Sequence, residues 1–417
     1  MTVHVILIGG EDHHLRLPFI RALRERGYRI TIAASGDPDP FTREGFDFRR
    51  FQFNRFWDVR SDFRALRAIA NLLREVDADV AHSFDTKLSL LVPLASRASP
   101  RTAIIRTING RGWTFSSRSP AALALRIAYR PLQRIASMTT DATVFEHRGD
   151  QAFFDRNRLI GRSRSVLIAG AGIDIDGFER ARQTGPSQQA LRCEFGLEGA
   201  EIVTTVARVT KQKGIPALLQ AADIVNRVRP SVRFLVVGPR ESEGSFAVSD
   251  GEFERRSSYV LATGSRADVP SILGMTDVFA FPSEYAEGVP RAIMEAALCA
   301  LPIVATNLPG CREVITDGWN GFLVPLHNPR SMADRILELL RDREAASVYA
   351  ARGPDVVRNK FSLDTVVAGH AELYDQCFQD RQSGRAGGTD RSSHVASKAI
   401  ADSAKSSSHF NSARKQS

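Results

Sequence analysis

The sequence predicts an α/β protein made of two doubly wound, parallel-sheet domains that face each other. Short β-branched runs alternate with amphipathic helical patterns in the first half of the chain, beginning with VHVILIG and PFIRALRERG. The same rhythm restarts at EIVTTVARV in the second half. Strands that alternate with helices are typical of βαβ units, in which helices cover both faces of a parallel sheet. Ligands are therefore expected at the carboxyl ends of the strands, in the cleft between the domains.

The chain is expected to divide into four parts. Residues 1–180 and 181–360 are the two predicted domains, residues 361–380 a C-terminal helix, and residues 381–417 a disordered tail. The polar stretch 179–190 contains Gly-Pro and is the predicted linker between the domains. The tail is rich in Ser, Lys, Arg, Gly and Ala, so it has too little apolar surface to form a core.

The overall composition is that of a globular protein, with 417 residues of which 43% are hydrophobic and 25% charged. The N-terminus lacks the basic and long apolar regions of a secretion signal, and no run approaches the ~18 apolar residues of a membrane-spanning helix. The cysteines form no C-x-x-C pair, so neither a disulfide framework nor a zinc site is expected. They are Cys193, Cys299, Cys311 and Cys377. These features predict a cytoplasmic protein.

The net charge of +9 is concentrated in one segment. Residues 101–140 contain seven arginines and no acidic residue, and Arg126, Arg130 and Arg134 recur every four residues. This spacing predicts a basic amphipathic helix, in which Pro131 could introduce a bend. Such a helix can lie on anionic lipid or simply be a solvated face, and the residues alone leave both open. Nucleic acid is not an expected partner, since the segment lacks interleaved aromatic residues and the chain contains no nucleic-acid-binding module.

Glu287 and Glu295 lie eight positions apart around the start of a predicted helix. Pro290 suits the first turn of a helix, which is therefore expected to begin near Val289 or Pro290. The free N–H groups of this helix start, with Gly288 permitting close approach of the backbone, are typical of an anion site. Hydroxyl groups of the same ligand could bind a carboxylate on each side. A sugar joined through a diphosphate to a ribose has this shape, although solvent-exposed glutamates would have the same spacing.

Arg208 and Lys213 follow the apolar strand in TTVARVTKQKG, just before Gly214 and the next predicted helix. Two cations at the carboxyl end of a strand can hold a diphosphate and stabilise it as a leaving group. Taken alone, both side chains are also typical of a solvated loop. Their position in the same domain as the glutamate pair favours the diphosphate site.

These motifs resemble those of the retaining glycosyltransferases of family 4, which have the GT-B fold of two facing Rossmann-like domains. The family has an arginine, four residues and a lysine, matched by Arg208 and Lys213, and then E-G-x-P with a second Glu eight positions after the first, matched by EGVPRAIMEAALCALPIVAT. The resemblance extends over roughly residues 1–380. It departs at Ala300, where the family usually has Gly, a position expected to matter only for packing.

The resemblance implies the roles of the site residues. Glu287 would bind hydroxyls of the donor sugar and Glu295 the ribose, while Arg208 and Lys213 would hold the diphosphate. The catalytic residues would be Arg208, Lys213 and Glu287. The donor-binding residues would be Gly10, Arg208, Lys213, Gly288, Val289, Pro290 and Glu295. No cofactor is implied, because a nucleoside-diphosphate sugar, with a UDP-sugar favoured, is the co-substrate.

The acceptor side is matched more loosely, by HHLRLPFIRAL and AHSFDTKLSLL. These stretches resemble the branch of the family that extends lipid-linked sugars for surface polysaccharides or glycoprotein glycans. The acceptor-side candidates are His14, Arg16, His82, Lys87 and Asn109, and each histidine could equally be a packing or solvated-loop residue. Asn109 stands where that branch commonly has a histidine. Because an amide cannot shuttle a proton at neutral pH, no general-base role is expected there.

Three D-x-D triplets raise the question of a metal site, since this pattern binds a divalent ion in another glycosyltransferase fold. They occur at residues 37–39, 77–79 and 174–176. The second leads into a predicted strand and the third lies in the turn that precedes the linker in the family. With Arg208 and Lys213 supplying positive charge, no metal is expected.

The function implied by the resemblance is a metal-independent, hexosyltransferase-type enzyme that transfers a sugar with retention of anomeric configuration. Its expected acceptor is a polyprenyl-diphosphate-linked saccharide in exopolysaccharide, O-antigen or glycan assembly. Residues 101–135 would then bind the anionic inner face of the cytoplasmic membrane. A nucleotide-sugar 2-epimerase of the same fold and a non-catalytic sugar-nucleotide-binding protein remain alternatives. An NAD-dependent dehydrogenase is disfavoured, because LIGGEDHHL lacks the three-glycine turn.

Overall fold

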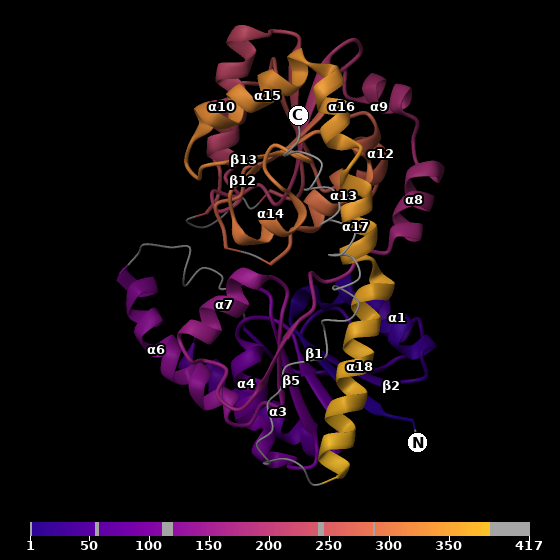
Figure 1. Ribbon diagram of the computed structural model, residues 1–417, viewed down its shortest axis with the longest axis vertical. Coiled ribbons are helices and arrows are strands. Elements are labelled where there is room, and N and C mark those ends of the chain that lie inside the picture. The colour runs from indigo at the N-terminus through magenta and orange to yellow at the C-terminus, as the bar shows by residue number, and fades with distance from the viewer. Residues whose placement is uncertain (1, 55–57, 111–119, 241–245, 287, 384–417) are drawn as a thin grey trace, which may run out of the picture.

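The computed structural model describes residues 2–54, 58–110, 120–240, 246–286 and 288–383, which form two domains around two parallel sheets (Figure 1). The order in the N-terminal sheet is β3 (Asp47–Arg50), β2 (Arg29–Ala34), β1 (His4–Gly9), β4 (Val80–Ser83), β5 (Ala103–Ile108), β6 (Ala142–Phe145) and β7 (Arg164–Leu167). The order in the C-terminal sheet is β10 (Val260–Gly264), β9 (Val232–Val237), β8 (Glu201–Val206), β11 (Val278–Phe281), β12 (Ile303–Thr306) and β13 (Phe322–Val324). Both orders are doubly wound, and the predicted fold class is confirmed.

Helices cover both faces of the N-terminal sheet because its strands are apolar on both sides. On β1, Val5 and Leu7 pack in one core cluster with α1 (Leu17–Glu25) and α18 (Leu363–Gln382). The alternate residues Ile6 and Ile8 pack in a second cluster with α3 (Val59–Val76) and α4 (Leu88–Ala95). The other helical segments are η1 (Glu11–Arg16), α2 (Asp39–Thr42), η2 (Ser96–Ala98), α6 (Pro120–Ser137) and α7 (Arg148–Arg156).

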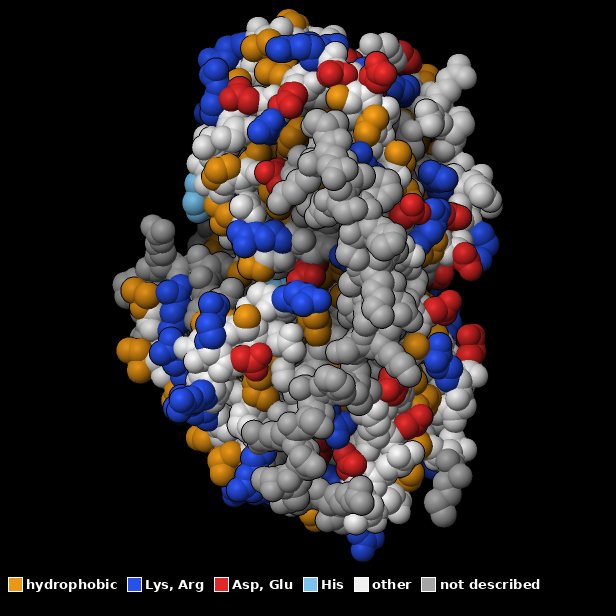
Figure 2. All heavy atoms as spheres, viewed as in Figure 1, with side chains coloured by type: hydrophobic (Ala, Val, Ile, Leu, Met, Phe, Trp, Pro, Cys, Tyr) orange, Lys and Arg blue, Asp and Glu red, His pale blue; other side chains and the backbone are white. Residues whose placement is uncertain are grey.

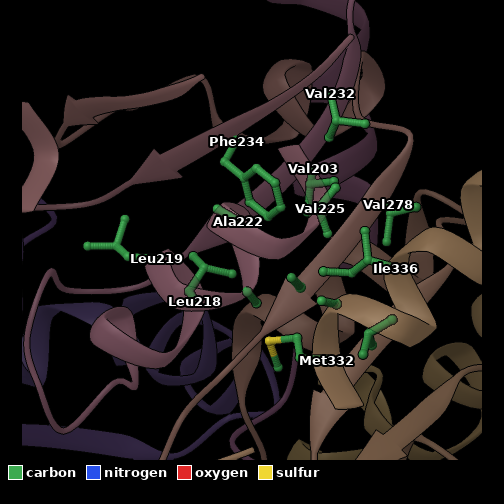
Figure 3. Close-up of a cluster of buried hydrophobic side chains, with 14 of the residues drawn as sticks. Val203, Leu218, Leu219, Ala222, Val225, Val232, Phe234, Val278, Met332 and Ile336 are labelled. Atoms are coloured by element: carbon green, nitrogen blue, oxygen red, sulfur yellow. The ribbon is translucent and has the colours of Figure 1, made fainter. Parts of the chain in front are cut away.

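The C-terminal sheet is likewise packed between two helical layers. Helices α10 (Ile215–Val228) and α15 (Pro329–Arg341) pack side by side on one face, where Val225 and Ile336 belong to the same buried cluster as Phe234 of the sheet (Figure 3). Phe279 and Ile293 belong to the cluster on the opposite face. The remaining helices are α8 (Ile175–Thr184), α9 (Gln188–Glu194), α11 (Asp250–Glu254), α12 (Val269–Gly274), α13 (Arg291–Leu298), α14 (Pro309–Val314), α16 (Arg343–Ala350) and α17 (Gly353–Phe361).

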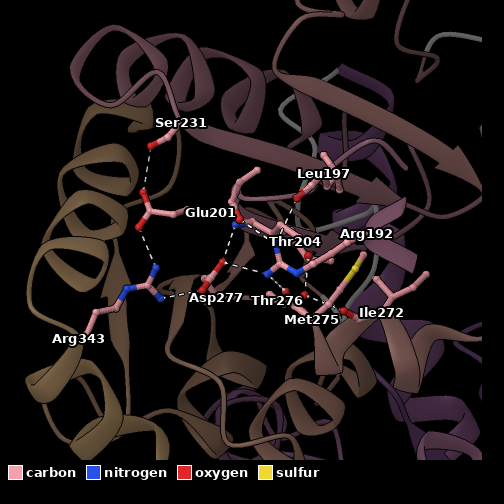
Figure 4. Close-up of polar contacts among 12 residues, drawn as sticks. Arg192, Leu197, Glu201, Thr204, Ser231, Ile272, Met275, Thr276, Asp277 and Arg343 are labelled. Atoms are coloured by element: carbon pink, nitrogen blue, oxygen red, sulfur yellow. Dashed lines mark hydrogen bonds and ion pairs between the residues drawn. The ribbon is translucent and has the colours of Figure 1, made fainter. Parts of the chain in front are cut away.

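A polar network fixes the amino-terminal ends of the C-terminal strands (Figure 4). The Asp277 carboxylate accepts the backbone N–H of Ile202 at 2.7 Å and a hydrogen bond from Arg343 at 2.8 Å. Arg343 also donates to Glu201 at 2.8 Å, and Arg192 of α9 donates to the carbonyl of Met275 at 3.0 Å. Two strands and two helices are thereby tied together at the end of the sheet opposite to the predicted site.

The C-terminal helix α18 packs on the N-terminal domain, where it lies along the lower domain in Figure 1. Tyr28 donates a hydrogen bond to the carbonyl of Ala371, and the hydroxyl of Tyr374 lies 2.6 Å from His82 Nδ1. The predicted linker 179–190 is largely helical, because Asp174 caps α8 by accepting the Gly177 N–H at 2.8 Å. The predicted tail is helical up to residue 382, and its residues 384–417 lie outside the described residues.

The position of Ala300 corrects one expectation drawn from the sequence. Ala300 follows the C-cap of α13 with φ of 51°, in the left-handed region that favours glycine. The backbone N–H of Leu301 donates to the carbonyl of Ala296 across this turn. The glycine common in the family therefore meets a conformational requirement and not a packing requirement.

Candidate functional site

The loops after β8 and β11 lie directly against each other at the carboxyl edge of the C-terminal sheet. Glu284 donates its backbone N–H to the carbonyl of Gln212 at 3.0 Å. Gly214 has φ of 68°, and a Cβ at this position would lie only 1.9 Å from the carbonyl oxygen of Pro282. The chain segment that carries Arg208 and Lys213 is therefore held beside the segment that leads into α13. These are neighbouring strands at the point where the strand order reverses, the usual place for a ligand in such sheets.

Helix α13 begins one residue later than the sequence suggests. Pro290 is its N-cap, with extended φ and ψ of −69° and 120°, and the helical residues run from Arg291 to Leu298. The carbonyl of Pro290 accepts the N–H groups of Ile293 and Met294, whereas the first amides of the helix have no partner within it. Helix starts of this kind are suited to anions, and the anion site here stays a prediction.

Glu295 lies in the second turn of α13, and its side chain is only 12% exposed. Its Oε1 accepts a hydrogen bond from Arg291 Nε at 2.7 Å. Burial raises the pKa of Glu295, while the positive charge of Arg291 opposes this shift. A hydroxyl-rich ligand that replaces water at this carboxylate would find an acceptor that is already largely desolvated.

The other predicted glutamate, Glu287, lies outside the described residues, so its role stays a prediction. Its neighbours Gly288 and Val289 are both buried. A Cβ on Gly288 would lie 2.1 Å from Glu146 Oε2 and 3.3 Å from the carbonyl oxygen of Asn109. Gly288 therefore touches the N-terminal domain, and the carboxyl ends of the two sheets meet at this residue.

On the N-terminal side of this contact, Asn109 follows β5 and Glu146 follows β6. Asn109 Nδ2 donates to Glu146 Oε1 at 2.6 Å, and an Arg16 guanidinium nitrogen lies 4.0 Å from the same oxygen. Burial raises the pKa of Glu146, whereas the charges of Arg16 and His147 lower it. Arg16 and Asn109 were predicted from the sequence, whereas Glu146 was not. Its position directly after the apolar run ATVF, at a predicted strand end, was the signal that could have identified it.

A small pocket lies beside this cluster, with Arg16, Phe84, Thr107, Glu146, Gly170 and His370 among the residues that line it. The Arg16 guanidinium lies 4.0 Å from the centre of the Phe84 ring, which fixes its position. His370 comes from α18, far along the chain from the strand ends that form much of the pocket wall. Its position in the site could not be read from the sequence, because it depends on the return of α18 to the N-terminal domain.

His82 and Lys87 do not behave as the acceptor-binding residues that the sequence suggested. His82 is fully buried, and both ring nitrogens are already bonded, to Tyr374 at 2.6 Å and to Thr107 at 2.7 Å. Its place on β4 points it into the core between the sheet and α18. Lys87 is also buried, forms an ion pair with Asp62 and donates to the carbonyl of Asn54 at 2.8 Å.

The remaining candidates of the N-terminal domain lie around the end of β1. The Gly10 N–H donates to Asp85 Oδ2 at 2.7 Å, so in this structure it is engaged within the protein and not directed to a diphosphate. A Cβ on Gly10 would lie 3.0 Å from the same carboxylate oxygen, which explains the glycine. His14 is exposed in η1, with its Nδ1 3.4 Å from the carbonyl of Glu11.

In each D-x-D triplet, one carboxylate accepts a hydrogen bond from a backbone N–H of the protein. Asp174 caps α8, Asp79 accepts the His4 N–H at 2.8 Å, and Asp37 accepts the Asp39 N–H at 3.0 Å. Among the described residues, no group of three or more His, Cys, Asp and Glu side chains is placed to hold a metal ion.

The basic segment 101–140 is divided between the core and the surface. Arg106 lies on β5, is fully buried, and donates to Gln133 at 2.7 Å and to Thr143 at 3.0 Å. It therefore cannot contribute to a surface patch, and burial lowers its pKa to about 10. Arg130 and Arg134 are exposed on α6, whereas Arg111 and Arg118 lie outside the described residues. No helix in the described part of the chain combines the length and apolar character needed to cross a bilayer.

Comparison with known proteins identifies the relatives of this chain. Residues 17–164 match the family model "Glycosyltransferase Family 4", and residues 200–342 match "Glycosyl transferases group 1". The chain is 31% identical over 359 residues to spore coat protein SA of Bacillus subtilis, covering 83% of this chain and 90% of that protein. It is 22% identical to an N,N'-diacetylbacillosaminyl-diphospho-undecaprenol α-1,3-N-acetylgalactosaminyltransferase of Campylobacter jejuni, over 89% of this chain and 97% of that protein. The solved structure of Anabaena HepE in complex with UDP and glucose superimposes on this chain with a TM-score of 0.70 at 20% sequence identity. The superposition covers 90% of this chain and 100% of that structure.

Proposed function

Because this chain belongs to the family-4 glycosyltransferases, we propose that it transfers a hexose from a UDP-sugar to a hydroxyl of a polyprenyl-diphosphate-linked saccharide, with retention of anomeric configuration. The observation that carries the proposal is the contact at Gly288, where the loop entering α13 meets Asn109 and Glu146. A sugar bound at the start of α13 would there lie within reach of groups from both domains.

In the proposed mechanism the diphosphate lies between Arg208, Lys213 and the first amides of α13. Positive charge at this position stabilises the negative charge that develops on the leaving group. Glu287 holds hydroxyls of the transferred sugar, and Glu295 holds the ribose. The acceptor hydroxyl attacks the anomeric carbon on the face from which the diphosphate departs. The new bond from oxygen to carbon forms as the bond to phosphate oxygen breaks, and that phosphate oxygen takes the hydroxyl proton.

Two relatives support the proposed donor and acceptor. The Anabaena neighbour was solved with UDP and glucose, and the Campylobacter relative is named for an undecaprenyl-diphosphate-linked acceptor. Arg208 and Lys213 supply the charge that a divalent ion supplies elsewhere, so the proposed reaction needs no metal. The product would be a lengthened lipid-linked saccharide for a surface polysaccharide or glycan.

A lipid-linked acceptor requires the enzyme to approach a membrane, and α6 presents a suitable surface. Tyr129 and Gln133 face the protein, whereas Ile127 and Met138 are 80% and 72% exposed on the outer side of the helix and of the turn after it. Exposed arginines lie among these apolar side chains, and Figure 2 shows both kinds together over α6, at the left of the lower domain. Exposed apolar side chains among arginines fit an anionic bilayer surface. We therefore propose that the enzyme works at the cytoplasmic face of the membrane.

The proposal is tested by incubating the purified protein with a panel of UDP-sugars, with and without a polyprenyl-diphosphate-linked saccharide, and following products by mass spectrometry. We expect donor consumption that depends on the acceptor, and NMR of the product should show the anomeric configuration of the donor. Complete conversion of the donor without acceptor would instead identify an epimerase. Donor binding without turnover across the whole panel would favour a non-catalytic binding protein.

A further inference from the structure

Two buried hydrogen-bond acceptors, one in the wall of the pocket near Gly288 and one beside it, have no partner among the described residues. Glu146 and His370 are 5% and 4% exposed, so both are almost fully removed from water. Glu146 Oε1 is bonded to Asn109, and Oε2, which is not among the fully buried atoms without a partner, borders Gly288. Nε2 of His370 and Oδ1 of Asn109 are buried, and neither has a partner in the described part of the structure. Unpaired buried acceptors are costly, and in native proteins they often mark places that a ligand or water completes.

The protonation state of His370 is fixed by its other nitrogen. Nδ1 lies 2.8 Å from the carbonyl oxygen of Val366, which can only accept, so Nδ1 carries the proton. Burial lowers the pKa of His370 to about 4, and the ring is neutral at physiological pH. Nε2 is therefore an acceptor. The pocket wall thus offers two acceptors, from Glu146 and His370, and one cationic donor, from Arg16.

The size and chemistry of the pocket define its ligand. It has room for a group of about the size of a water molecule, which excludes a phosphate or a sugar ring. A hydroxyl group both donates and accepts, whereas an anion cannot donate to the acceptors of Glu146 and His370. The Gly288 backbone borders Glu146 Oε2, so a saccharide held at the start of α13 would lie next to it.

We infer that this pocket binds one saccharide hydroxyl during transfer, whose single hydrogen is shared between the Glu146 carboxylate and His370 Nε2 and whose oxygen accepts from Arg16. This inference rests on the proposed function and adds a specificity-determining group, Glu146, on the side of the site opposite to Glu295. Asn109, which replaces the family's common histidine, acts as a positioning residue because its amide holds Oε1 and leaves Oε2 directed to the ligand. The hydroxyl belongs either to the transferred sugar or to the acceptor saccharide.

The test is the Glu146→Gln variant, assayed with the donor and acceptor found for the wild type. Gln can keep the bond from Asn109 through its carbonyl oxygen but presents an N–H₂ group where Oε2 stood, so it turns an acceptor into a donor. We expect kcat/KM to fall about 10- to 100-fold, as for the loss of a hydrogen bond to a charged group. A change in the KM of the donor identifies the transferred sugar as the source of the hydroxyl, and a change in the KM of the acceptor identifies the acceptor saccharide.

Deoxy analogues separate recognition from a structural role. With the wild type, kcat/KM should be lower for a substrate that lacks the bound hydroxyl than for the parent substrate. With Glu146→Gln, the kcat/KM values of the parent and of the deoxy analogue should be nearly equal. The second variant, His370→Asn, can retain the bond to the Val366 carbonyl but lacks Nε2, and should show the same pattern. The matched control is Glu313→Gln, which alters the domain contact between Glu313 and the Arg148 N–H, 2.9 Å apart, away from the pocket.

The pH profile gives an independent readout. The charged and titratable groups around Glu146 are Arg16 from η1, His147 and Asp150 near the start of α7, and Asp85 after β4. Protonation removes the negative charge of the carboxylate and so weakens the hydrogen bond that it accepts; wild-type kcat/KM should therefore fall as the pH drops through the raised pKa of Glu146. Glu146→Gln should lack this limb of the profile.

Unchanged kcat/KM in Glu146→Gln for both substrates would overturn the inference while leaving the transferase intact. A ratio of kcat/KM on parent to kcat/KM on deoxy substrate that is the same in Glu146→Gln as in the wild type would do so too. No transfer by the wild type would instead count against the proposed function. A covalent hexosyl adduct on the wild type, absent from Glu146→Gln and detected by intact mass after incubation with donor alone, would also overturn it. In that case Glu146 would be a nucleophile and not a hydroxyl-binding residue.

Discussion

Replacing Gly288 with alanine should weaken the contact between the domains at the site. The added Cβ would lie 2.1 Å from Glu146 Oε2, whereas real Cβ contacts essentially never fall below 3.0 Å, so the carboxylate must move by at least 0.9 Å. Glu146 is buried and is held by Asn109 at 2.6 Å, so this movement breaks or bends that hydrogen bond. A hydrogen bond to a charged group contributes about 1.5–3 kcal/mol, which corresponds to roughly a 10- to 150-fold loss in kcat/KM.

The assay is a double-mutant cycle with Gly288→Ala, Glu146→Ala and the double variant, measured by sugar transfer and by urea unfolding. Shortening Glu146 removes the atom that clashes, so the double variant should lose clearly less than the sum of the single losses. Gly274→Ala is the matched control, because its nearest atom would lie 3.8 Å from the new Cβ. Additive losses, or a Gly288→Ala variant with wild-type activity, would refute the proposed contact.

Three further predictions concern other parts of the molecule. Ala300→Gly should stabilise the protein by about 1 kcal/mol in urea unfolding, because Ala300 has φ of 51°, in the region that favours glycine. The control Ala351→Gly, at φ of −59°, should destabilise the protein. A destabilised Ala300→Gly variant would contradict backbone strain at Ala300. Glu295→Gln should lower UDP affinity by about tenfold in calorimetry. The same variant should unfold at a higher temperature at pH 7, because burial raises the pKa of the Glu295 carboxyl and such a group stabilises the fold less as the pH rises through that pKa. The gain should disappear below about pH 4, under the unfolded pKa, and an equal gain at both pH values would refute this origin. Replacing Arg126, Arg130 and Arg134 with Gln should reduce sedimentation with anionic vesicles at least severalfold, while activity on a water-soluble acceptor stays unchanged. Unaltered sedimentation would contradict the proposed contact of α6 with the membrane.

The sequence contained enough information to predict the fold and the position of the donor segments, because these depend on local patterns. Strand and helix periodicity predicts that both segments lie at the carboxyl ends of strands in one domain, and the observed strand order, in which β8 and β11 are neighbours, brings them side by side. The structure confirms the fold class, whereas the roles of the individual side chains remain predictions.

The acceptor side was harder to predict, because its residues depend on contacts between distant segments. His82 was interpretable as a site residue or as a packing residue, and only the return of α18 with Tyr374 places it in the core. The same return brings His370 into the pocket. Arg106 was grouped with a surface patch because arginine is rarely buried, yet Thr143 and Gln133 satisfy its guanidinium inside the domain.

A crystal structure of the protein with UDP would test the central claim most directly. We expect the β-phosphate within hydrogen-bonding distance of the Lys213 ammonium and the first backbone amides of α13. The ribose hydroxyls should donate hydrogen bonds to the Glu295 carboxylate. UDP bound away from the loops after β8 and β11, or with its diphosphate directed away from Arg208 and Lys213, would contradict it.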